Sequence, residues 1–326
     1  MRKNMEKKTR ILVSNDDGYL AKGINSLVEV LREFGDVDVF APHKGRSGQG
    51  CAITSEVPVK LTPITDDRDA PVQIYACTGT PCDCVKAAID GRMVEYDLVV
   101  GGINHGDNSA VNAHYSGTMG VVLEGCMKGI PSVAFSLCSH DADADFTPTY
   151  DVIRKIVAKV LEKGLPKGSC LNVNFPDTPS YAGIKVCRQA MGRWVNEWEV
   201  KDDPRGSNGK WLFLTGEFVV DDTDPEADRV ALDNNYVTIT PISIDMTDYK
   251  LLAEMKEWME RKEYDAAEKI AFFTDIYNKL GVKEICEKRI EALFAKCDEY
   301  INNISVAEEK KEMLKDFANS LLDRKL

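Results

Sequence analysis

Two adjacent aspartates follow the first apolar run of the chain. Residues 11–14 read ILVS, and Asn15, Asp16, Asp17 and Gly18 come directly after them. An aspartate that follows a strand is a common helix N-cap, so one aspartate needs no other explanation. Two side chains cannot cap the same amide, and adjacent like charges repel each other unless a cation or a proton offsets them. The pair therefore predicts either a helix cap or a cation-binding or catalytic site.

A glycine-rich loop forms a second polar cluster. Residues 41–54 read APHKGRSGQGCAIT, in which Arg46 and Ser47 stand between Gly45 and Gly48. Glycines let backbone amides approach an anion closely. The order of residues matches neither the P-loop nor the G-x-G-x-x-G pattern, so nothing supports a site for a nucleoside triphosphate or a dinucleotide. The loop predicts an anion site or, as the alternative, a surface turn with a solvated arginine.

A third cluster combines an asparagine with hydroxyl groups. Residues 101–120 read GGINHGDNSAVNAHYSGTMG and place Asn104 at the end of an expected strand. Ser116 and Thr118 bring hydroxyls and free amides to the start of an expected helix, which is a natural phosphate-binding arrangement. Ordinary capping by Ser116 explains the same pattern.

The fourth cluster is TGTPCDCV at residues 78–85, where Asp83 lies near the start of an expected helix. A residue that starts the helix is the simplest interpretation of this aspartate. The alternative is a side chain that shapes a base or sugar pocket, and the pattern leaves both open.

The elements that would position these clusters alternate between strand and helix. Apolar residues at helical spacing over 24–31 end before Gly35, and the apolar run 37–42 follows within the length of one βαβ unit. A second helix is expected over 150–163, ending at Gly164. This alternation predicts a mostly parallel sheet that is covered on both faces.

Ligands of such sheets bind beyond the carboxyl ends of the strands, where all four clusters are expected. We therefore expect the clusters to converge on one crevice. Two carboxylates, a hydroxyl and an amide oxygen make a site of hard oxygen ligands, which suits Mg²⁺ or Mn²⁺ rather than Zn²⁺.

Composition limits the classes of partner. The chain has 326 residues, 44% of them hydrophobic, and 41 Lys and Arg stand against 53 Asp and Glu for a net charge of −12. This balance argues against nonspecific attraction to a nucleic-acid duplex or an anionic membrane. The absence of a signal-peptide pattern and of a membrane-spanning run predicts a cytoplasmic protein. The ten cysteines lack zinc-site spacing and are expected to be free thiols.

The second half of the chain changes character twice. Strand-like segments between 183 and 241, with the polar run 202–210 between them, predict an antiparallel arm or hairpin. Such an arm either pairs with another copy of the chain or folds back on its own sheet. We favour pairing between copies, which would make the protein an oligomer. Residues 251–326 are rich in charged, helix-favouring residues and predict three or four amphipathic helices. We expect a domain over 1–250 and a helical extension after it.

Several strings in one order resemble a known family. The matching strings are ILVSNDDGYLAKGI, APHKGRSGQGCAIT, GTPCDCV, DLVVGGINHGDN, HYSGTMGVVLEG, GIPSVAFS, DPRG and YVTITPI. In this order they resemble the SurE family of survival-protein 5′/3′-nucleotidases, and the likeness runs from residue 11 to about residue 249. So many ordered motifs are far more specific than any single one.

The resemblance implies a Rossmann-like three-layer α/β domain with a hairpin arm and a C-terminal segment that form homodimers or homotetramers. It implies a divalent-metal-dependent phosphomonoesterase that acts on nucleoside 5′- and 3′-monophosphates, and in some members on short polyphosphate. By position, the family's metal ligands are similar to Asp16, Asp17, Ser47 and Asn104, and the two aspartates also resemble its catalytic pair. The phosphate and substrate contacts are similar to Asn15, Gly48, Asn108, Ser116, Gly117 and Thr118.

Three departures from the family pattern stand out. Gly101 occupies a position where the family commonly has serine, the loop reads APHKGRSG where APDRNRSG is more usual, and the helices after residue 251 run beyond the usual family end. The first two leave the matched ligands in place and bear on substrate preference. The third bears on assembly and on access to the crevice.

Two alternatives remain at this point. A phosphatase of the haloacid dehalogenase type also places a nucleophilic aspartate after its first strand, but the D-x-D pattern is absent. A non-catalytic protein that binds nucleotides and recruits partners through the helical tail is the alternative from another class.

Overall fold

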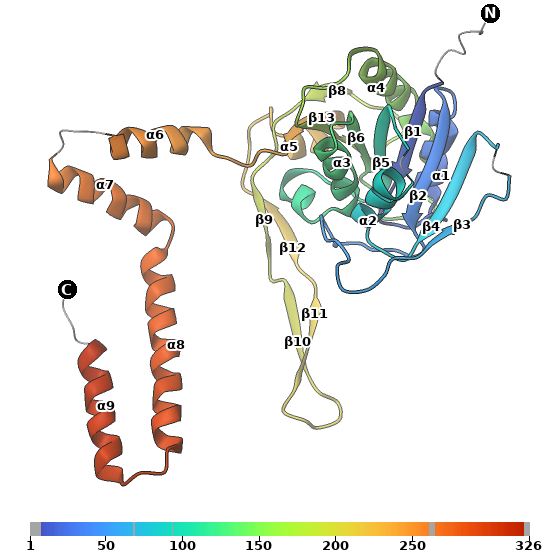
Figure 1. Ribbon diagram of the computed structural model, residues 1–326. Coiled ribbons are helices and arrows are strands. Elements are labelled where there is room, and N and C mark those ends of the chain that lie inside the picture. Colours follow the sequence, from blue (N-terminus) through green and yellow to red (C-terminus); the bar gives the residue numbers. More distant parts are fainter. Residues whose placement is uncertain (1–7, 68, 93, 261–264, 323–326) are drawn as a thin grey trace, which may run out of the picture. The chain divides into compact units, whose positions relative to one another are not determined.

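A nine-stranded sheet forms the centre of the part of the chain that the computed structural model describes, which is residues 8–67, 69–92, 94–260 and 265–322. Its strand order is β3-β4-β2-β1-β5-β6-β7-β13-β8 (Figure 1). The strands are β1 (Arg10–Ser14), β2 (Asp36–Pro42), β3 (Leu61–Pro63), β4 (Val72–Cys77), β5 (Leu98–His105), β6 (Ser132–Leu137), β7 (Ser169–Phe175), β8 (Gly183–Val186) and β13 (Tyr236–Ser243).

The central strands of this sheet are parallel and reverse their order once. From β1 the chain steps outward to β2 and then to β4, and all these pairs are parallel. It then returns to the other side of β1 and continues through β5, β6 and β7, again in parallel. The switch in direction therefore lies between β1 and β5, which is where ligands of open α/β sheets bind.

Helices cover both faces of the sheet (Figure 1). Helices α1 (Lys22–Leu31) and α4 (Tyr150–Lys163) contact each other over one face, and α2 (Pro81–Lys86) and α3 (Gly117–Met127) contact each other over the opposite face. Ile11 and Val13 belong to the core on the α1 side, whereas Leu12 belongs to the core on the α3 side. This alternation along β1 is the expected result of burying both faces of a strand.

The amphipathic patterns identified in the sequence form the helices that they predict. Helix α1 buries Ile24, Leu27 and Leu31 against the sheet. Helix α4 ends at Gly164, whose φ of 69° is a left-handed conformation that favours glycine, so the predicted stop is confirmed. The remaining short elements of this part are a π-helix at Ala87–Gly91, 3₁₀-helices at Ala110–His114 and Thr147–Thr149, and α5 (Asp228–Asp233).

The arm is narrower than the sequence pattern suggests. The projecting hairpin consists of β9 (Gly192–Val195), β10 (Trp198–Asp202), β11 (Lys210–Leu214) and β12 (Glu217–Val220). The outer segments of the expected arm, β8 and β13, instead extend the main sheet, because β13 pairs antiparallel with β7 and parallel with β8. The polar run 203–209 lies at the hairpin tip, between β10 and β11.

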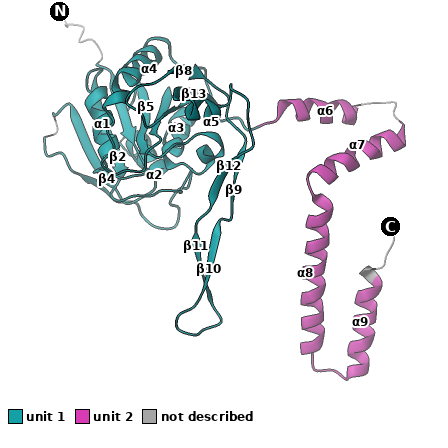
Figure 2. Cartoon of the chain, turned by 180° about the vertical axis from the view of Figure 1, so that it is seen from behind, with its two compact units in different colours: residues 1–246 teal, residues 247–326 magenta. Residues whose placement is uncertain are grey.

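The chain divides into two compact units, residues 1–246 and 247–326, which we call the α/β unit and the helical unit (Figure 2). The helical unit consists of α6 (Tyr249–Glu260), α7 (Ala266–Lys279), α8 (Val282–Asn303) and α9 (Glu308–Leu322). No helix in the described ranges is long and apolar enough to span a membrane. The predicted α/β class, with a mostly parallel sheet, a hairpin and C-terminal helices, is confirmed.

Candidate functional site

The turn after β1 is closed by the side chain of Asn15. Its Nδ2 donates to the carbonyl of Gly18 at 3.0 Å, and its Oδ1 accepts from the amide of Gly18 at 3.1 Å. Helix α1 starts only at Lys22, and its N-cap residue, Ala21, makes no side-chain cap hydrogen bond. The helix-cap interpretation of the two aspartates is therefore wrong, and the turn instead holds both at the carboxyl end of β1.

Asp16 is buried against the start of α3. The hydroxyl of Thr118 donates to its Oδ1 at 2.7 Å. A Cβ added to Gly117 would lie 2.6 Å from the Cβ of Asp16, so the helix approaches this closely only because residue 117 is glycine. Burial raises the pKa of Asp16 to about 6, against the hydrogen bond from Thr118, and the charge of Asp17 raises it further.

Asn104 faces Asp16 from the neighbouring strand. The pairing of β5 with β6 is irregular between Gly101 and Asn104, and such an irregularity changes the direction of the side chains at the end of β5. The Nδ2 of Asn104 donates to the carbonyl of Gly106 at 2.7 Å, and its Oδ1 lies 3.4 Å from the hydroxyl of Thr118. The amide oxygen, a hard ligand, therefore points to the same hydroxyl that contacts Asp16.

Asp17 lies beside two histidines that the sequence patterns did not single out. Its Oδ2 accepts from the amide of His105 at 3.2 Å. Burial raises the pKa of Asp17, and the hydrogen bond from the amide of His105 opposes that rise. The ring of His140 packs over Gly106, where an added Cβ would lie 2.4 Å from its Cε1. No local pattern could have identified His140, because its place depends on the fold.

The ring of His105 also holds the start of α1. Its Nε2 accepts from the amide of Gly23 at 3.3 Å, and its Nδ1 lies 3.0 Å from the carbonyl of Asp141. Because an amide only donates and a carbonyl only accepts, these contacts fix the tautomer with the proton on Nδ1. His105 therefore links the turn that carries Asp17 to the helix that follows it.

The glycine-rich loop lies against the aspartate turn. The amide of Arg46 donates to the carbonyl of Asp16 at 2.6 Å, and Ser47 and Gly48 follow as exposed residues. The arginine is partly buried within a largely exposed loop. Its Nη2 donates to the carbonyl of Thr78 at 2.6 Å, while its buried Nε has no hydrogen-bond partner among the described residues. An anion in the crevice would satisfy such a donor.

The predicted phosphate contacts of this segment lie at the start of α3 and in the loop after β5, and all of them are buried. Ser116 caps α3, because its hydroxyl accepts from the amide of Met119 at 3.0 Å, so the capping interpretation is correct. The amide of Gly117 hydrogen-bonds to Asp16, and the hydroxyl of Thr118 binds the same carboxylate, so the start of α3 faces the first aspartate. Asn108 is buried, and its Nδ2 donates to the hydroxyl of Ser136 at 2.8 Å.

Asp83 forms a capping box with Thr80 at the start of α2. It also accepts hydrogen bonds from the amide and the hydroxyl of Thr54, at 3.1 and 2.6 Å. Burial disfavours its charge, but the hydrogen bonds from Thr54 and Thr80 outweigh burial and lower its pKa. The helix-start interpretation of this aspartate is confirmed, and the side chain also fastens the glycine-rich loop to α2.

The donor set fits a hard divalent cation. Two carboxylates and an amide oxygen meet at the switch point between β1 and β5, and one carboxylate is almost fully buried without an arginine or lysine partner in the described hydrogen bonds. Within the same residues, no group of three or more His, Cys, Asp or Glu side chains is placed to hold a metal. Zinc sites usually need such a group, whereas Mg²⁺ binds one or two carboxylates with water and phosphate.

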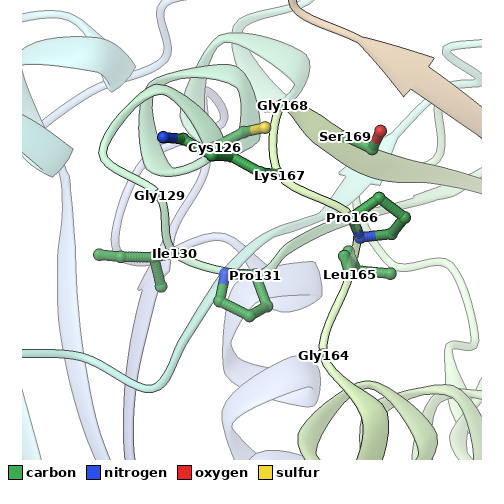
Figure 3. Close-up of a pocket in the computed structure, with 10 residues that line it drawn as sticks. All are labelled: Cys126, Gly129, Ile130, Pro131, Gly164, Leu165, Pro166, Lys167, Gly168 and Ser169. Atoms are coloured by element: carbon green, nitrogen blue, oxygen red, sulfur yellow. The ribbon is translucent and has the colours of Figure 1, made fainter.

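A cavity at the opposite edge of the sheet contains none of these residues. It has a volume of about 270 Å³ and lies at the amino ends of β6 and β7 (Figure 3). Its lining is mostly glycine, proline and aliphatic side chains, with Lys167 as the one charged residue. The carboxyl edge therefore remains the candidate site.

Comparison with known proteins gives one consistent family. The family model of survival protein SurE matches residues 11–196. A protein of Bacteroides thetaiotaomicron named 5′-nucleotidase SurE is 53% identical over 261 residues, which is 79% of this chain and 99% of that protein. A protein of Phocaeicola vulgatus with the same name is 53% identical over 257 residues, covering 78% of this chain and 98% of that protein.

A solved structure agrees with these relatives. The crystal structure of the SurE protein from Aquifex aeolicus matches with a TM-score of 0.64 and 34% sequence identity, over 77% of this chain and all of that one. The matched family model and relatives span the strands and loops that form the site described above. The chain therefore belongs to the SurE family.

Proposed function

We propose that the chain is a divalent-metal-dependent phosphomonoesterase that releases phosphate from nucleoside 5′-monophosphates. The observation that carries this proposal is the meeting of Asp16, Asp17 and Asn104 with the start of α3 at the switch point of the sheet. The activity named in relatives that are 53% identical supports it.

Asp16, Asp17, Ser47 and Asn104 would hold one divalent ion, either Mg²⁺ or Mn²⁺. When bound, the ion supplies charge neutralisation at the phosphate and makes a nearby water more acidic. Asp17 accepts the proton of the attacking water, since it is the less buried of the two aspartates and therefore more accessible to a water in the crevice. Asp16 stays in place through its hydrogen bond with Thr118.

The phosphate group would lie against the start of α3. The backbone amide of Thr118 donates to its oxygens beside Gly117, and Gly48 lets the loop amide approach from the other side. The buried, unpartnered Nε of Arg46 is suited to the same anion. Ser116 would act mainly through its cap on α3 and Asn15 through the turn that it closes, whereas Asn108 would support the crevice through its hydrogen bond with Ser136.

Other parts of the proposal go beyond the 5′-nucleotidase activity. Nucleoside 3′-monophosphates and short polyphosphate are further candidate substrates, because both present a phosphate group to the proposed site at the start of α3. The exposed hairpin over 192–220 is suited to pairing with another copy in a homodimer or homotetramer. We further propose that the α/β unit forms the phosphatase domain and that the helical unit is a separate extension.

The test is phosphate release from 5′- and 3′-monophosphates and polyphosphate with Mg²⁺, Mn²⁺ or EDTA. Asp16→Asn is compared with the wild type, and Asp143→Asn, an exposed aspartate, is the matched control. We expect metal-dependent release that the first variant loses and the control keeps. Binding of nucleotide without phosphate release at any ion would instead support the non-catalytic alternative, and a trapped aspartyl-phosphate would support a covalent mechanism.

A further inference from the structure

A cavity of about 430 Å³ opens beside the candidate phosphate site. Its lining includes Gly48 of the glycine-rich loop, Asn112 and Tyr115 of the segment before α3, and Trp194 and Glu197 at the base of the hairpin. Its exposed lining is mostly apolar, with a few polar groups at the edges. Small-molecule sites typically have this composition and volumes of about 300–1,000 Å³.

The cavity is lined by residues that adjoin the start of α3 and the glycine-rich loop. Tyr115 directly precedes the cap residue Ser116, and its carbonyl accepts from the amide of Gly50 at 3.0 Å. Gly48 lies two residues after Arg46, whose amide binds the carbonyl of Asp16. A phosphate held at the start of α3 therefore leaves the rest of its molecule within reach of the cavity.

Trp194 forms a fixed aromatic wall of the cavity. Its indole N–H donates to Oδ1 of Asn112 at 2.9 Å, and its ring packs against Phe218 with centroids 5.5 Å apart. Trp194 as a residue is nevertheless 38% exposed, and Tyr115 is 60% exposed. Because the N–H already has its partner, the surface that Trp194 presents is mainly that of its apolar ring. A side chain held in this way loses little conformational entropy when a flat ligand stacks on it.

We propose that this cavity binds the base of the nucleoside monophosphate and that it prefers guanine. The inference rests on the proposed function for its phosphate site. Trp194 and Tyr115 stack on the base, since every base has a π-face that an aromatic ring can cover. The carboxylate of Glu197 accepts the N1–H and the exocyclic N–H of guanine, whereas it would face the N1 lone pair of adenine.

Binding of guanosine in EDTA, measured by calorimetry, tests the base site without phosphate or metal. We expect Trp194→Ala to weaken binding by about 10- to 100-fold, the range typical for loss of one stacking partner. Trp198→Ala is the matched control, because Trp198 is an exposed tryptophan of the same hairpin that lies outside the cavity lining. Trp194→Phe should keep most of the affinity, which separates stacking from a general loss of structure.

Kinetics with three substrates test the role of the base in turnover. We expect Trp194→Ala to lower kcat/KM for guanosine 5′-monophosphate by about 10-fold or more, mainly through KM, and to leave ribose 5-phosphate unchanged within about 2-fold. Glu197→Gln should reduce the preference for the guanine over the adenine nucleotide by about 10-fold, since one bidentate pairing is lost. Glu199→Gln, on the same hairpin but outside the cavity, is its control.

The outcomes separate this inference from the proposed function. Equal guanosine affinity of wild type and Trp194→Ala overturns the base site, whatever the phosphatase does. Failure of guanosine to bind at all also overturns it, including the case in which a second copy of the chain fills the cavity. Guanosine binding that depends on Trp194, together with no phosphate release from any substrate, supports the base site and overturns the proposed phosphatase.

Discussion

Helices α4 and α8 both carry apolar residues within charged sequences, but α4 has the stronger amphipathic pattern and the larger buried face. Helix α4 has 14 residues and buries five of them, Val152, Ile153, Ile156, Val157 and Val160. Helix α8 has 22 residues and buries only Ile301. The apolar stripe of α4 is covered by α1 and the sheet, whereas α8 contacts mainly α7 and α9 among the described helices. Periodicity thus predicts a helix, and neighbouring elements decide whether its apolar face is buried.

The same contrast separates the two units as wholes. The α/β unit contains the hydrophobic clusters around the sheet and every predicted site residue. In the helical unit, Ile301 and Ala318 are the only buried hydrophobic residues among those described. The matches cover 77–79% of this chain but 97–99% of the length of the relatives. The helical unit therefore lies largely outside the region that this chain shares with them. We therefore expect the phosphatase chemistry to depend on the α/β unit and to depend little on the helical unit.

Replacing Asp17 should have the largest effect. We expect Asp17→Asn to lower kcat for a nucleoside 5′-monophosphate by about 10²- to 10⁴-fold, because both a proton acceptor and a negatively charged ligand are lost. Asp298→Asn in α8 should change kcat by less than about 2-fold, because surface substitutions remote from a site rarely matter. Full turnover by Asp17→Asn would defeat the role proposed for this residue.

Adding a single methyl group to a glycine of α3 should test how tightly the α/β unit is packed. In Gly120→Ala the new Cβ would lie 2.4 Å from the carbonyl oxygen of Gly50 and 3.0 Å from Sγ of Cys82. We expect the free energy of unfolding in urea to fall by about 1–3 kcal/mol, with loss of phosphate release as the loop shifts. Gly91→Ala is the control, since its Cβ would meet no atom within 4 Å. Equal stability of the two variants would contradict the close contact between α3 and the loop.

Alkylation rates should differ between Cys51, an exposed cysteine of the α/β unit, and Cys286, an exposed cysteine of the helical unit. The hydrogen bond with Cys82 lowers the pKa of the Cys51 thiol to about 7, against the effect of burial. Because the thiolate is the reactive form, alkylation of Cys51 by iodoacetamide should rise with pH around a midpoint near 7. At pH 7 we expect Cys51 to react about 5- to 10-fold faster than Cys286 of α8, as followed by mass spectrometry.

Cys82→Ala provides the control for this difference. It should move the midpoint of Cys51 alkylation upward, toward the ordinary thiol value of about 8.5, and remove most of the advantage over Cys286. An unchanged midpoint would show that the neighbouring thiol is not the cause.

Removal of the helical unit should have the smallest effect. We expect a chain that ends at Met246 to keep kcat/KM for nucleoside monophosphates within about 3-fold, because the two units are compact in themselves. Sedimentation of the shortened and full chains shows in parallel whether assembly depends on the extension. Loss of turnover in a shortened chain that still folds would show that the helical unit contributes to activity.

The sequence predicted much of the site because its signals are local. The aspartate turn and Asn104 each follow a recognisable apolar run, and the parallel order of those runs brings their ends to one edge. The start of α3 lies in the segment that follows Asn104. The limits of the arm were harder to predict. Apolar and polar residues alternate along β13 as in a hairpin strand, but β13 pairs with β7 of the main sheet. Strand partners are chosen by long-range contacts that periodicity does not contain.

By itself, the sequence determined the helix stops, the strand ends and the residue types of the phosphate crevice, because these depend on neighbours within a few positions. Only the tertiary structure decided that His140 lies near Asp17 and that Trp194 packs against Asn112, 82 residues earlier in the chain. It also decided the burial that raises the pKa of Asp16. Contacts between distant segments and exclusion of water exist only after the chain has folded, and no local pattern records them.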